Sequence, residues 1–130
     1  MKAYVVLATK GRPTDIPVIL DILQRQTVIP DHIVVVGTME GDFGEGRRVA
    51  NGDSAISFEL SARPGLPIQR NVGIEAILSK HGDADDNFMI AYFDDDFRPE
   101  FDWIERARDV LDAHDVGSGG WYIRTWNFRG

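Results

Sequence analysis

The chain of 130 residues contains no cysteine, an excess of acidic residues and no long apolar run. The absence of cysteine excludes a disulfide framework and metal sites built on thiolates. With 14 lysines and arginines against 21 aspartates and glutamates, the net charge of −7 argues against a nucleic-acid or anionic-membrane surface, because both require a basic patch. No segment approaches the roughly 20 apolar residues of a membrane span, and residues 3–9 are too short and strand-like for a signal peptide. We therefore expect a cytoplasmic protein with no transmembrane segment and no nucleic-acid partner.

Strand and helix patterns alternate along the first part of the chain. Residues 3–8 and 33–36 are continuous apolar runs, which are typical of buried parallel strands. Between them, a helical pattern places four aliphatic residues on one face: Ile16, Ile19, Leu20 and Leu23. A strand, a helix and a strand in this order imply a parallel crossover. The stretch 38–53 has several glycines and no hydrophobic period, which predicts a mobile loop of the kind that contacts ligands.

The same alternation continues to the end of the chain. Polar and apolar residues alternate over 56–61, which predicts a half-buried strand near a sheet edge. Three further patterns follow: a helix at roughly 67–79 that packs through Ile68, Val72, Ala76 and Ile77, an apolar strand at 88–93, and a helix after Pro99 with Phe101, Ile104, Ala107 and Leu111 on its inner face. Residues 121–126 are typical of a fifth strand. We expect an α/β fold, a mainly parallel, Rossmann-like sheet with helices on both faces, in one domain over 1–130.

Three consecutive carboxylates, Asp94, Asp95 and Asp96, follow the apolar run 88–93. Ligands in open α/β sheets collect at the carboxyl ends of such strands. Carboxylates at positions i and i+2 can converge on one hard cation, and Mg²⁺ typically takes one or two carboxylates together with substrate phosphates. The pattern therefore favours a phosphate-bearing ligand held through a metal. The alternative is a solvated acidic turn.

Three motifs occur in an order that points to a known family. They are Thr9-Lys10-Gly11-Arg12-Pro13 after the first strand, Gln69-Arg70-Asn71-Val72-Gly73-Ile74 in the second helix, and Phe93-Asp94-Asp95-Asp96 after the fourth strand. With them, the chain resembles family 2 glycosyltransferases of the GT-A fold. The segment 97–104, where a proline precedes a helix, is also similar, and the resemblance covers about residues 3–111.

The resemblance implies a glycosyltransferase that moves a sugar from a UDP- or GDP-linked donor to an acceptor hydroxyl. An Asp-x-Asp motif would meet the ribose and a Mn²⁺ or Mg²⁺ ion. Charge builds on the leaving nucleoside diphosphate as the glycosidic bond breaks, and a metal there stabilises that charge. The resemblance assigns Asp96 and Asp94 to the metal and five residues to the donor: Thr9, Arg12, Arg70, Asp94 and Asp95.

Several of these residues have a second interpretation. Arg70 either pairs with a donor phosphate or is a surface arginine paired with an acid. The loop from Thr9 to Arg12 either contacts the nucleoside or only leads into the helix. Asp95, which lies on the opposite side of the strand from Asp94 by the period of two, is predicted to hold an arginine or backbone groups in place of the ligand. Asn71 is assigned a structural role between helix and loop.

The chain departs from the family pattern in two places. Family members carry an acidic residue just after the second strand, whereas this chain reads Val36-Gly37-Thr38, which leaves Glu40 or Asp42 as the substitute. The family's acceptor half, with its carboxylate base, has no counterpart before Gly130, so no catalytic base is assigned. The chain is then expected to be the N-terminal, nucleotide-binding part of a longer enzyme.

Two other classes of protein compete with this hypothesis. Phosphotransfer folds also place aspartates at strand ends, but their nucleophile follows an earlier strand, and here the first strand ends in Thr9. The other class is a non-catalytic, truncated GT-A-like module that binds a nucleotide or another protein. In that case Trp121, Trp126 and Phe128 would be exposed and would favour a homodimer, unless they belong to the core.

Overall fold

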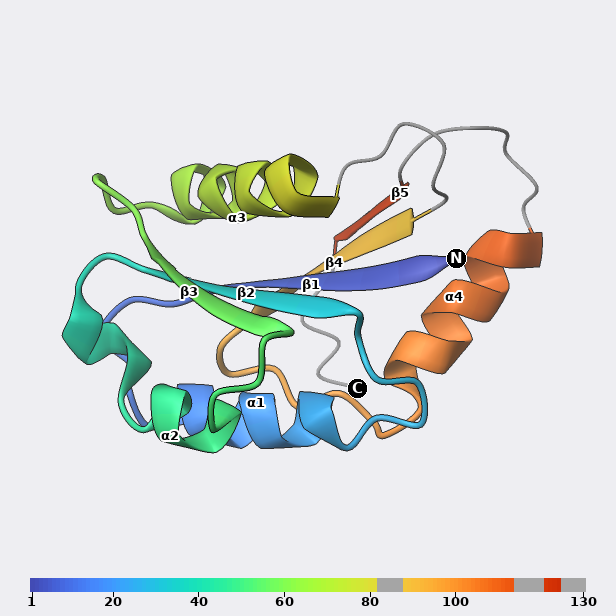
Figure 1. Ribbon diagram of the computed structural model, residues 1–130, viewed down its shortest axis with the longest axis horizontal. Coiled ribbons are helices and arrows are strands. Elements are labelled where there is room, and N and C mark those ends of the chain that lie inside the picture. Colours follow the sequence, from blue (N-terminus) through green and yellow to red (C-terminus); the bar gives the residue numbers. More distant parts are fainter. Residues whose placement is uncertain (82–87, 114–120, 125–130) are drawn as a thin grey trace.

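The computed structural model describes residues 1–81, 88–113 and 121–124, the last of these as backbone alone. Its elements are β1 (Lys2–Ala8), α1 (Asp15–Gln24), β2 (His32–Gly37), the 3₁₀ helix η1 (Glu40–Phe43), α2 (Gly46–Ala50), β3 (Ile56–Leu60), α3 (Leu66–His81), β4 (Phe88–Asp94), α4 (Trp103–Ala113) and β5 (Trp121–Arg124). The strands form one sheet in the order β3-β2-β1-β4-β5, and each neighbouring pair is parallel (Figure 1).

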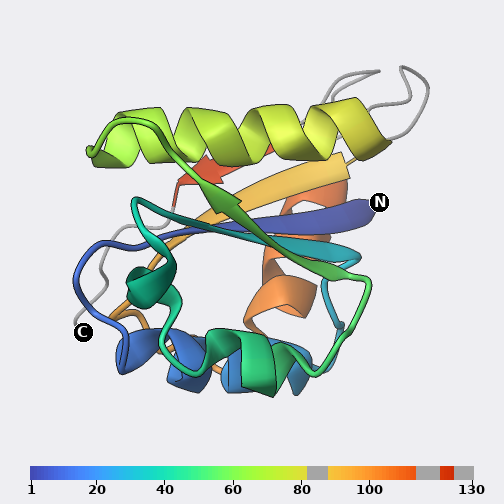
Figure 2. The ribbon, with the colours of Figure 1, turned by 60° about the vertical axis from the view of Figure 1, so that its left-hand side comes forward.

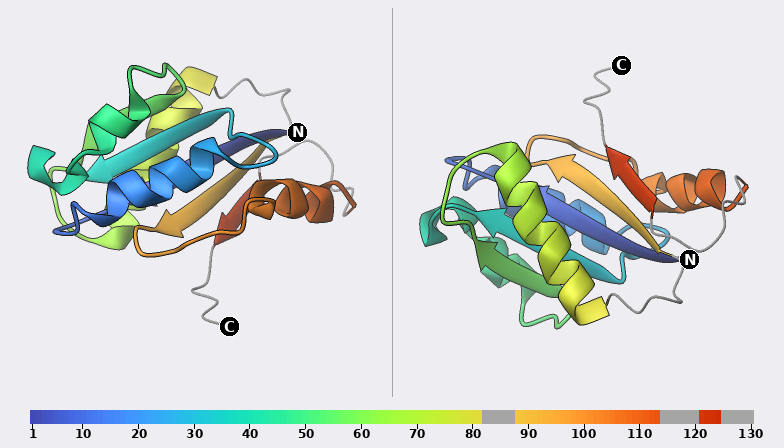
Figure 3. Two further views of the ribbon diagram at one scale, coloured as in Figure 1. Left: turned by 90° about the horizontal axis from the view of Figure 1, so that it is seen from below. Right: turned by 90° about the horizontal axis from the view of Figure 1, so that it is seen from above.

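Helices cover both faces of this sheet. Helix α3 lies on one face, and α1, α2 and α4 lie on the other (Figures 1 and 2). Seen from above and from below, α3 crosses the strands on one side while α1 and α4 run beneath them on the other (Figure 3). Because both faces are covered, β1, β2 and β4 are buried along nearly their whole length, which explains their continuous apolar sequences. The predicted α/β architecture is confirmed.

The larger part of the core lies between the sheet and the helices α1 and α4. The four aliphatic residues predicted for the first helix are all fully buried, as expected from their spacing. In the last helix, Ile104 is buried and Ala107 and Leu111 pack against the core. The prediction for Phe101 was wrong. It precedes α4 and is exposed under the Arg25 guanidinium, while Trp103 instead packs edge-on against Phe93 with ring centroids 4.8 Å apart.

Helix α3 covers the other face through Gln69, Gly73 and Ile77, which are spaced four residues apart and are all buried. The prediction that Ile68 packs inward was wrong, because the buried stripe is centred one residue later and leaves Ile68 exposed. Gly73 marks a close helix-sheet contact, as expected. A Cβ atom there would lie 2.5 Å from Cγ1 of Val6, so only glycine lets the helix approach the strand this closely.

The stretch predicted as a mobile loop instead forms η1 and α2, packed beside α1. Phe43 is buried, with its ring 5.0 Å from that of Phe58. Gly44 adopts a φ of 52° and lies so close to Pro13 that a Cβ would meet its carbonyl oxygen at 2.1 Å. The glycines therefore permit tight packing against the β1–α1 connection. Sequence periodicity does not indicate these elements, because single residues rather than a periodic face provide the burial.

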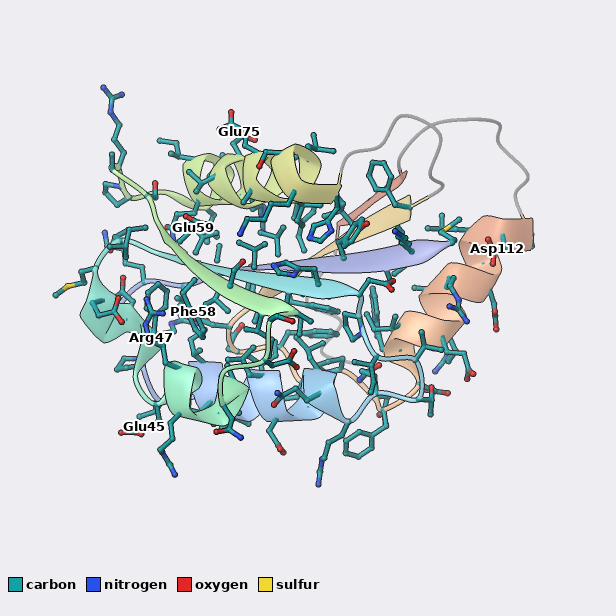
Figure 4. The ribbon with its side chains drawn as sticks, viewed as in Figure 1. Glu45, Arg47, Phe58, Glu59, Glu75 and Asp112 are labelled. Atoms are coloured by element: carbon teal, nitrogen blue, oxygen red, sulfur yellow. The ribbon has the colours of Figure 1, made fainter. Side chains whose placement is uncertain are left out.

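Strand β3 lies at the edge of the sheet, as its alternating pattern predicted. Figure 4 shows Phe58 and Glu59 on opposite sides of this strand, with Arg47 of α2 next to Phe58. The Arg47 guanidinium stacks 4.6 Å from the centre of the Phe58 ring and pairs with Glu40.

None of the described helices is long and apolar enough to cross a membrane. Trp126, Phe128 and the Trp121 side chain, on which the homodimer prediction depends, lie outside the described residues.

Candidate functional site

The strand order reverses between β1 and β4, since the chain runs outward from β1 to β3 and then returns to the other side of β1. In parallel α/β sheets, such a reversal leaves a crevice beyond the carboxyl ends of the two central strands, where ligands bind. A cleft of about 310 Å³ lies at this point. It is lined by residues at the ends of β1 and β4, in the segments that follow these strands and at the start of α3: Ala8, Lys10, Arg12, Leu66, Asp94, Asp95 and Asp96.

Two arginines pair with all three carboxylates of the cleft. Arg70 of α3 lies 3.3 Å from Asp94, and Arg12 lies 3.3 Å from Asp95 and 3.4 Å from Asp96. The Arg70 pair is the better shielded, with side chains only 16% and 26% exposed, whereas the Arg12 side chain is 55% exposed. The fold thus brings together Arg12, Arg70 and the acidic triplet, which are up to 84 positions apart in the sequence. The first and third sequence motifs therefore line one cleft, and Arg70 of the second motif lies beside it through its pair with Asp94.

Asp95 is the buried member of the triplet and differs from its neighbours. Its carboxylate accepts a hydrogen bond from the Thr9 hydroxyl at 2.9 Å and one from Arg12. Burial is the largest cause that raises the pKa of Asp95. With the neighbouring Asp15 and Asp96 carboxylates, it outweighs the lowering effects of the Thr9 hydrogen bond and the Arg12 charge. Thr9 is itself buried, with its N–H donating to the Val36 carbonyl. Thr9 therefore lies beneath the cleft and positions Asp95. Asp95 in turn holds Arg12, which is one of the two interpretations predicted for it.

The connection after β1 is fixed by Asp42 of η1. Its buried carboxylate accepts hydrogen bonds from the N–H of Gly11 and Thr38 at 2.8 Å, from the Thr38 hydroxyl at 2.8 Å and from the Met39 N–H at 3.2 Å. Burial alone would raise the pKa of Asp42, but these hydrogen bonds outweigh it, so the pKa is lowered. Asp42 is thus occupied in holding two loops together, and Glu40 pairs with Arg47. Neither carboxylate reaches the cleft lining.

Gln69 performs the structural role that the sequence assigned to Asn71. The Gln69 side chain is buried and donates to the carbonyl oxygens of Thr9 and Val36, at 2.8 and 2.9 Å. It therefore joins α3 to the ends of two strands, one of which leads into the cleft. Asn71 is exposed, so that assignment was wrong. The four-residue spacing of Gln69 with Gly73 and Ile77 is the signal that could have identified it.

Three cleft features were not assigned from sequence. Lys10 and Leu66 line the cleft, and Arg98 contacts the backbone of Asp95. The Arg98 guanidinium donates to the Asp95 carbonyl oxygen and to the Asp15 carboxylate, both at 2.8 Å, and so ties the acidic turn to the start of α1. Lys10 and Arg98 both stand in the motifs that carried the resemblance. For Leu66, the position after a Pro-Gly turn is the one feature of the sequence that points to a place at the cleft.

The acidic triplet fits a metal ion only in a limited sense. Within the described ranges, no group of three or more His, Cys, Asp or Glu side chains is placed to hold a metal. Asp94 and Asp96 do line the cleft, and their side chains are 26% and 29% exposed. Because Mg²⁺ commonly takes only one or two carboxylates and completes its shell with phosphates and water, these residues suit a cation shared with a bound ligand.

The strand order and layers define an α/β protein of Rossmann-like fold. A solved structure shares this fold, the crystal structure of 4-diphosphocytidyl-2C-methyl-D-erythritol synthase, with a TM-score of 0.51 and 15% sequence identity. The match covers 70% of this chain and 46% of that chain, so the chain matches less than half the length of that structure. No protein-family model and no curated protein sequence matches the chain. The likeness concerns the fold, and membership of glycosyltransferase family 2 stays a prediction.

Proposed function

We propose that the cleft binds the diphosphate of a nucleotide sugar together with Mn²⁺ or Mg²⁺, and that the chain is the donor-binding part of a glycosyltransferase. The observation that carries the proposal is the cleft at the point where the strand order reverses. It is lined by Lys10, Arg12, Asp94 and Asp96, and Arg70 pairs with Asp94 beside it. Cations that can pair with phosphate and carboxylates that can hold a divalent ion thus share one opening.

Each residue has a distinct role in the proposed complex. Arg12, Arg70 and Lys10 would bind the phosphates, the two arginines with the planar geometry that suits paired oxygens. Asp96 and Asp94 would hold the divalent ion. A metal bound there would stabilise the negative charge that develops on the nucleoside diphosphate as it leaves. Thr9 and Asp95 would keep Arg12 in place from below, and Leu66 would supply the one large apolar contact of the cleft lining.

A second candidate is nucleotidyl transfer, in which an acceptor phosphate attacks the α-phosphate of a nucleoside triphosphate, the bond to the β-phosphate breaks, and a diphosphate-linked product and pyrophosphate form. The similar solved structure is named as the synthase of a diphosphocytidyl compound, which favours this alternative over other classes of activity. Both reactions place negatively charged phosphates beside a metal, so the cleft residues named above serve either one. The two candidates differ in the ligand: a sugar-linked diphosphate in the first, a triphosphate in the second.

Calorimetric titration of the purified chain tests the proposal and separates the candidates. The ligands are UDP, GDP, CDP, their sugar conjugates and the matching triphosphates, each with and without Mn²⁺. We expect one base to bind best, only with the metal, and a sugar diphosphate to bind more tightly than the triphosphate. Tighter binding of the triphosphate would move the assignment to nucleotidyl transfer. A folded chain that binds none of these ligands would contradict both candidates.

A further inference from the structure

The pairing of the acidic triplet with arginines leads to an inference that rests on the proposed function. In the free protein Asp94 is paired with Arg70, and Asp96 with Arg12, at 3.3 and 3.4 Å. The residues proposed to hold the metal are therefore the partners of the residues proposed to hold the phosphates. We propose that Arg12 and Arg70 act as exchange partners: they occupy the carboxylates until phosphate binds them, and the cleft then becomes competent to bind the divalent cation.

Charge is the first reason for this order. The three carboxylates of the triplet face Lys10 and Arg12 in the cleft lining and Arg70 beside it, while Arg98 contacts the Asp95 backbone and pairs with Asp15. A divalent cation that entered the free cleft would meet guanidinium groups already within 3.4 Å of its ligands, and like charges at such distances repel strongly where solvent is partly excluded. A diphosphate meets no such obstacle, because it can bind the cations directly.

The geometry of the pairs is the second reason. Each pair is held by one long contact, a hydrogen bond of 3.3 Å for Arg70 with Asp94 and an ion pair of 3.4 Å for Arg12 with Asp96. A phosphate offers oxygens that can accept two parallel N–H groups from one guanidinium at shorter distances. Exchange of a long carboxylate contact for a phosphate contact is therefore favourable, and it removes the arginines from the two carboxylates proposed to hold the metal.

The two arginines are expected to contribute unequally. Arg70 and Asp94 are mostly buried, so their mutual attraction is little screened by solvent. Arg12 is about half exposed, so its pair with Asp96 is weaker and opens more easily. Arg70 therefore exerts most of the control over the cation, while Arg12 is held near the triplet by the buried Asp95.

Coupling between two ligands is reciprocal, which gives a quantitative test. We expect saturating UDP to raise the affinity for Mn²⁺ by a factor within the usual range of about 5- to 150-fold, and saturating Mn²⁺ to raise the affinity for UDP by the same factor. Mn²⁺ and UDP also associate in solution, so their titration without protein supplies the correction. If the chain proves to prefer another nucleotide, that nucleotide replaces UDP in the same design.

Arginine variants give the more distinctive result, because they are measured with Mn²⁺ alone. Arg70→Gln leaves Asp94 without its cation, so we expect several-fold tighter binding of Mn²⁺ in the absence of nucleotide, together with weaker binding of UDP and smaller coupling. Arg12→Gln should act in the same direction to a lesser degree, and its exposure makes loss of folding a minor concern. Arg25→Gln, which removes an exposed pair with Asp21 outside the cleft, is the matched control and should change nothing.

The outcomes separate this inference from the proposed function. If Mn²⁺ and UDP bind in the cleft but with a coupling factor of one, or if both arginine variants bind Mn²⁺ alone no better than the wild type, the exchange is contradicted and the proposed function stands. If the folded wild type binds no nucleotide with any metal, the proposed function itself fails. An arginine that merely supported the structure would lower the affinity for metal and nucleotide alike, so a gain in Mn²⁺ affinity identifies the exchange.

Discussion

Asp96→Ala is expected to weaken metal-dependent nucleotide binding by at least about 100-fold while the chain stays folded. Loss of a residue that only supports a metal ligand commonly costs about 10- to 100-fold in metal affinity, so the loss of a direct ligand should reach at least the upper end of that range. Asp96 lines the cleft and is partly exposed, and its pair with the exposed Arg12 is screened by solvent. Calorimetric titration of nucleotide with Mn²⁺ measures the effect, and thermal unfolding confirms the fold.

Asp102→Ala is the matched control for this substitution. Asp102 is another partly exposed aspartate with an arginine partner, Arg106 at 3.8 Å, but it lies at the start of α4 and outside the cleft lining. Asp102→Ala and Asp96→Ala each remove one negative charge from an acidic protein, so any general effect of net charge on anion binding appears in both variants. Equal binding by Asp96→Ala and the wild type would contradict the assignment of Asp96 to the metal.

Asp42→Ala is expected to lower the free energy of unfolding by about 3 kcal/mol at neutral pH. The substitution removes the acceptor that the buried Asp42 carboxylate offers to the N–H groups of Gly11, Thr38 and Met39, and hydrogen bonds to a charged group are each worth roughly 1.5 to 3 kcal/mol. It also separates η1 from the connection that follows β1. Denaturant unfolding at pH 7 measures the change. Asp53→Ala, which removes one exposed hydrogen bond to the Ala55 N–H, is the control and should cost much less.

The same substitution has a pH dependence whose direction follows from the lowered pKa of Asp42. The folded state holds this carboxylate charged more strongly than the unfolded chain does, where the pKa is about 3.9. Its contribution to stability is therefore complete above about pH 4 and is lost as the pH falls through the lower pKa of the folded state. The stability difference between wild type and Asp42→Ala should shrink on acidification below about pH 4. A difference that stays constant across that window would contradict the role given to the charged carboxylate.

The strands and the long helices could be predicted from sequence because burial on a periodic face determines them. The apolar runs of β1, β2 and β4 and the inner face of α1 have this property, and the structure confirms them. Helix α3 was placed correctly in the sequence, but its buried face includes Gln69 and Gly73, which carry no hydrophobic signal. The four-residue spacing of Gln69 with Gly73 and Ile77 indicates the buried position, but the two strand carbonyls that the Gln69 side chain satisfies can be recognised only when the neighbouring strand ends are known.

The site was predictable in part for a related reason. The position of the acidic triplet at the end of an apolar strand indicates a site. The parallel pairing of β1 with β4 then brings the end of β1 beside the triplet. The pairing of Arg12 and Arg70 with particular carboxylates was not predictable, because it depends on the approach of α3 and of the β1–α1 connection. The same holds for Asp42, whose stretch lacks any periodic pattern and packs through glycines that allow close contact.

The measurement that tests the central claim most directly is the effect of Mn²⁺ on the amide signals of the ¹⁵N-labelled chain, recorded by NMR with and without UDP. A paramagnetic ion broadens the signals of nearby residues and so locates itself. In the presence of UDP, we expect broadening centred on Asp94 to Asp96 and on Lys10 to Arg12, and little effect at α4 or at the β3 edge. Broadening centred elsewhere, or none under conditions where UDP and Mn²⁺ are bound, would contradict the assignment of the cleft between β1 and β4 as the nucleotide site.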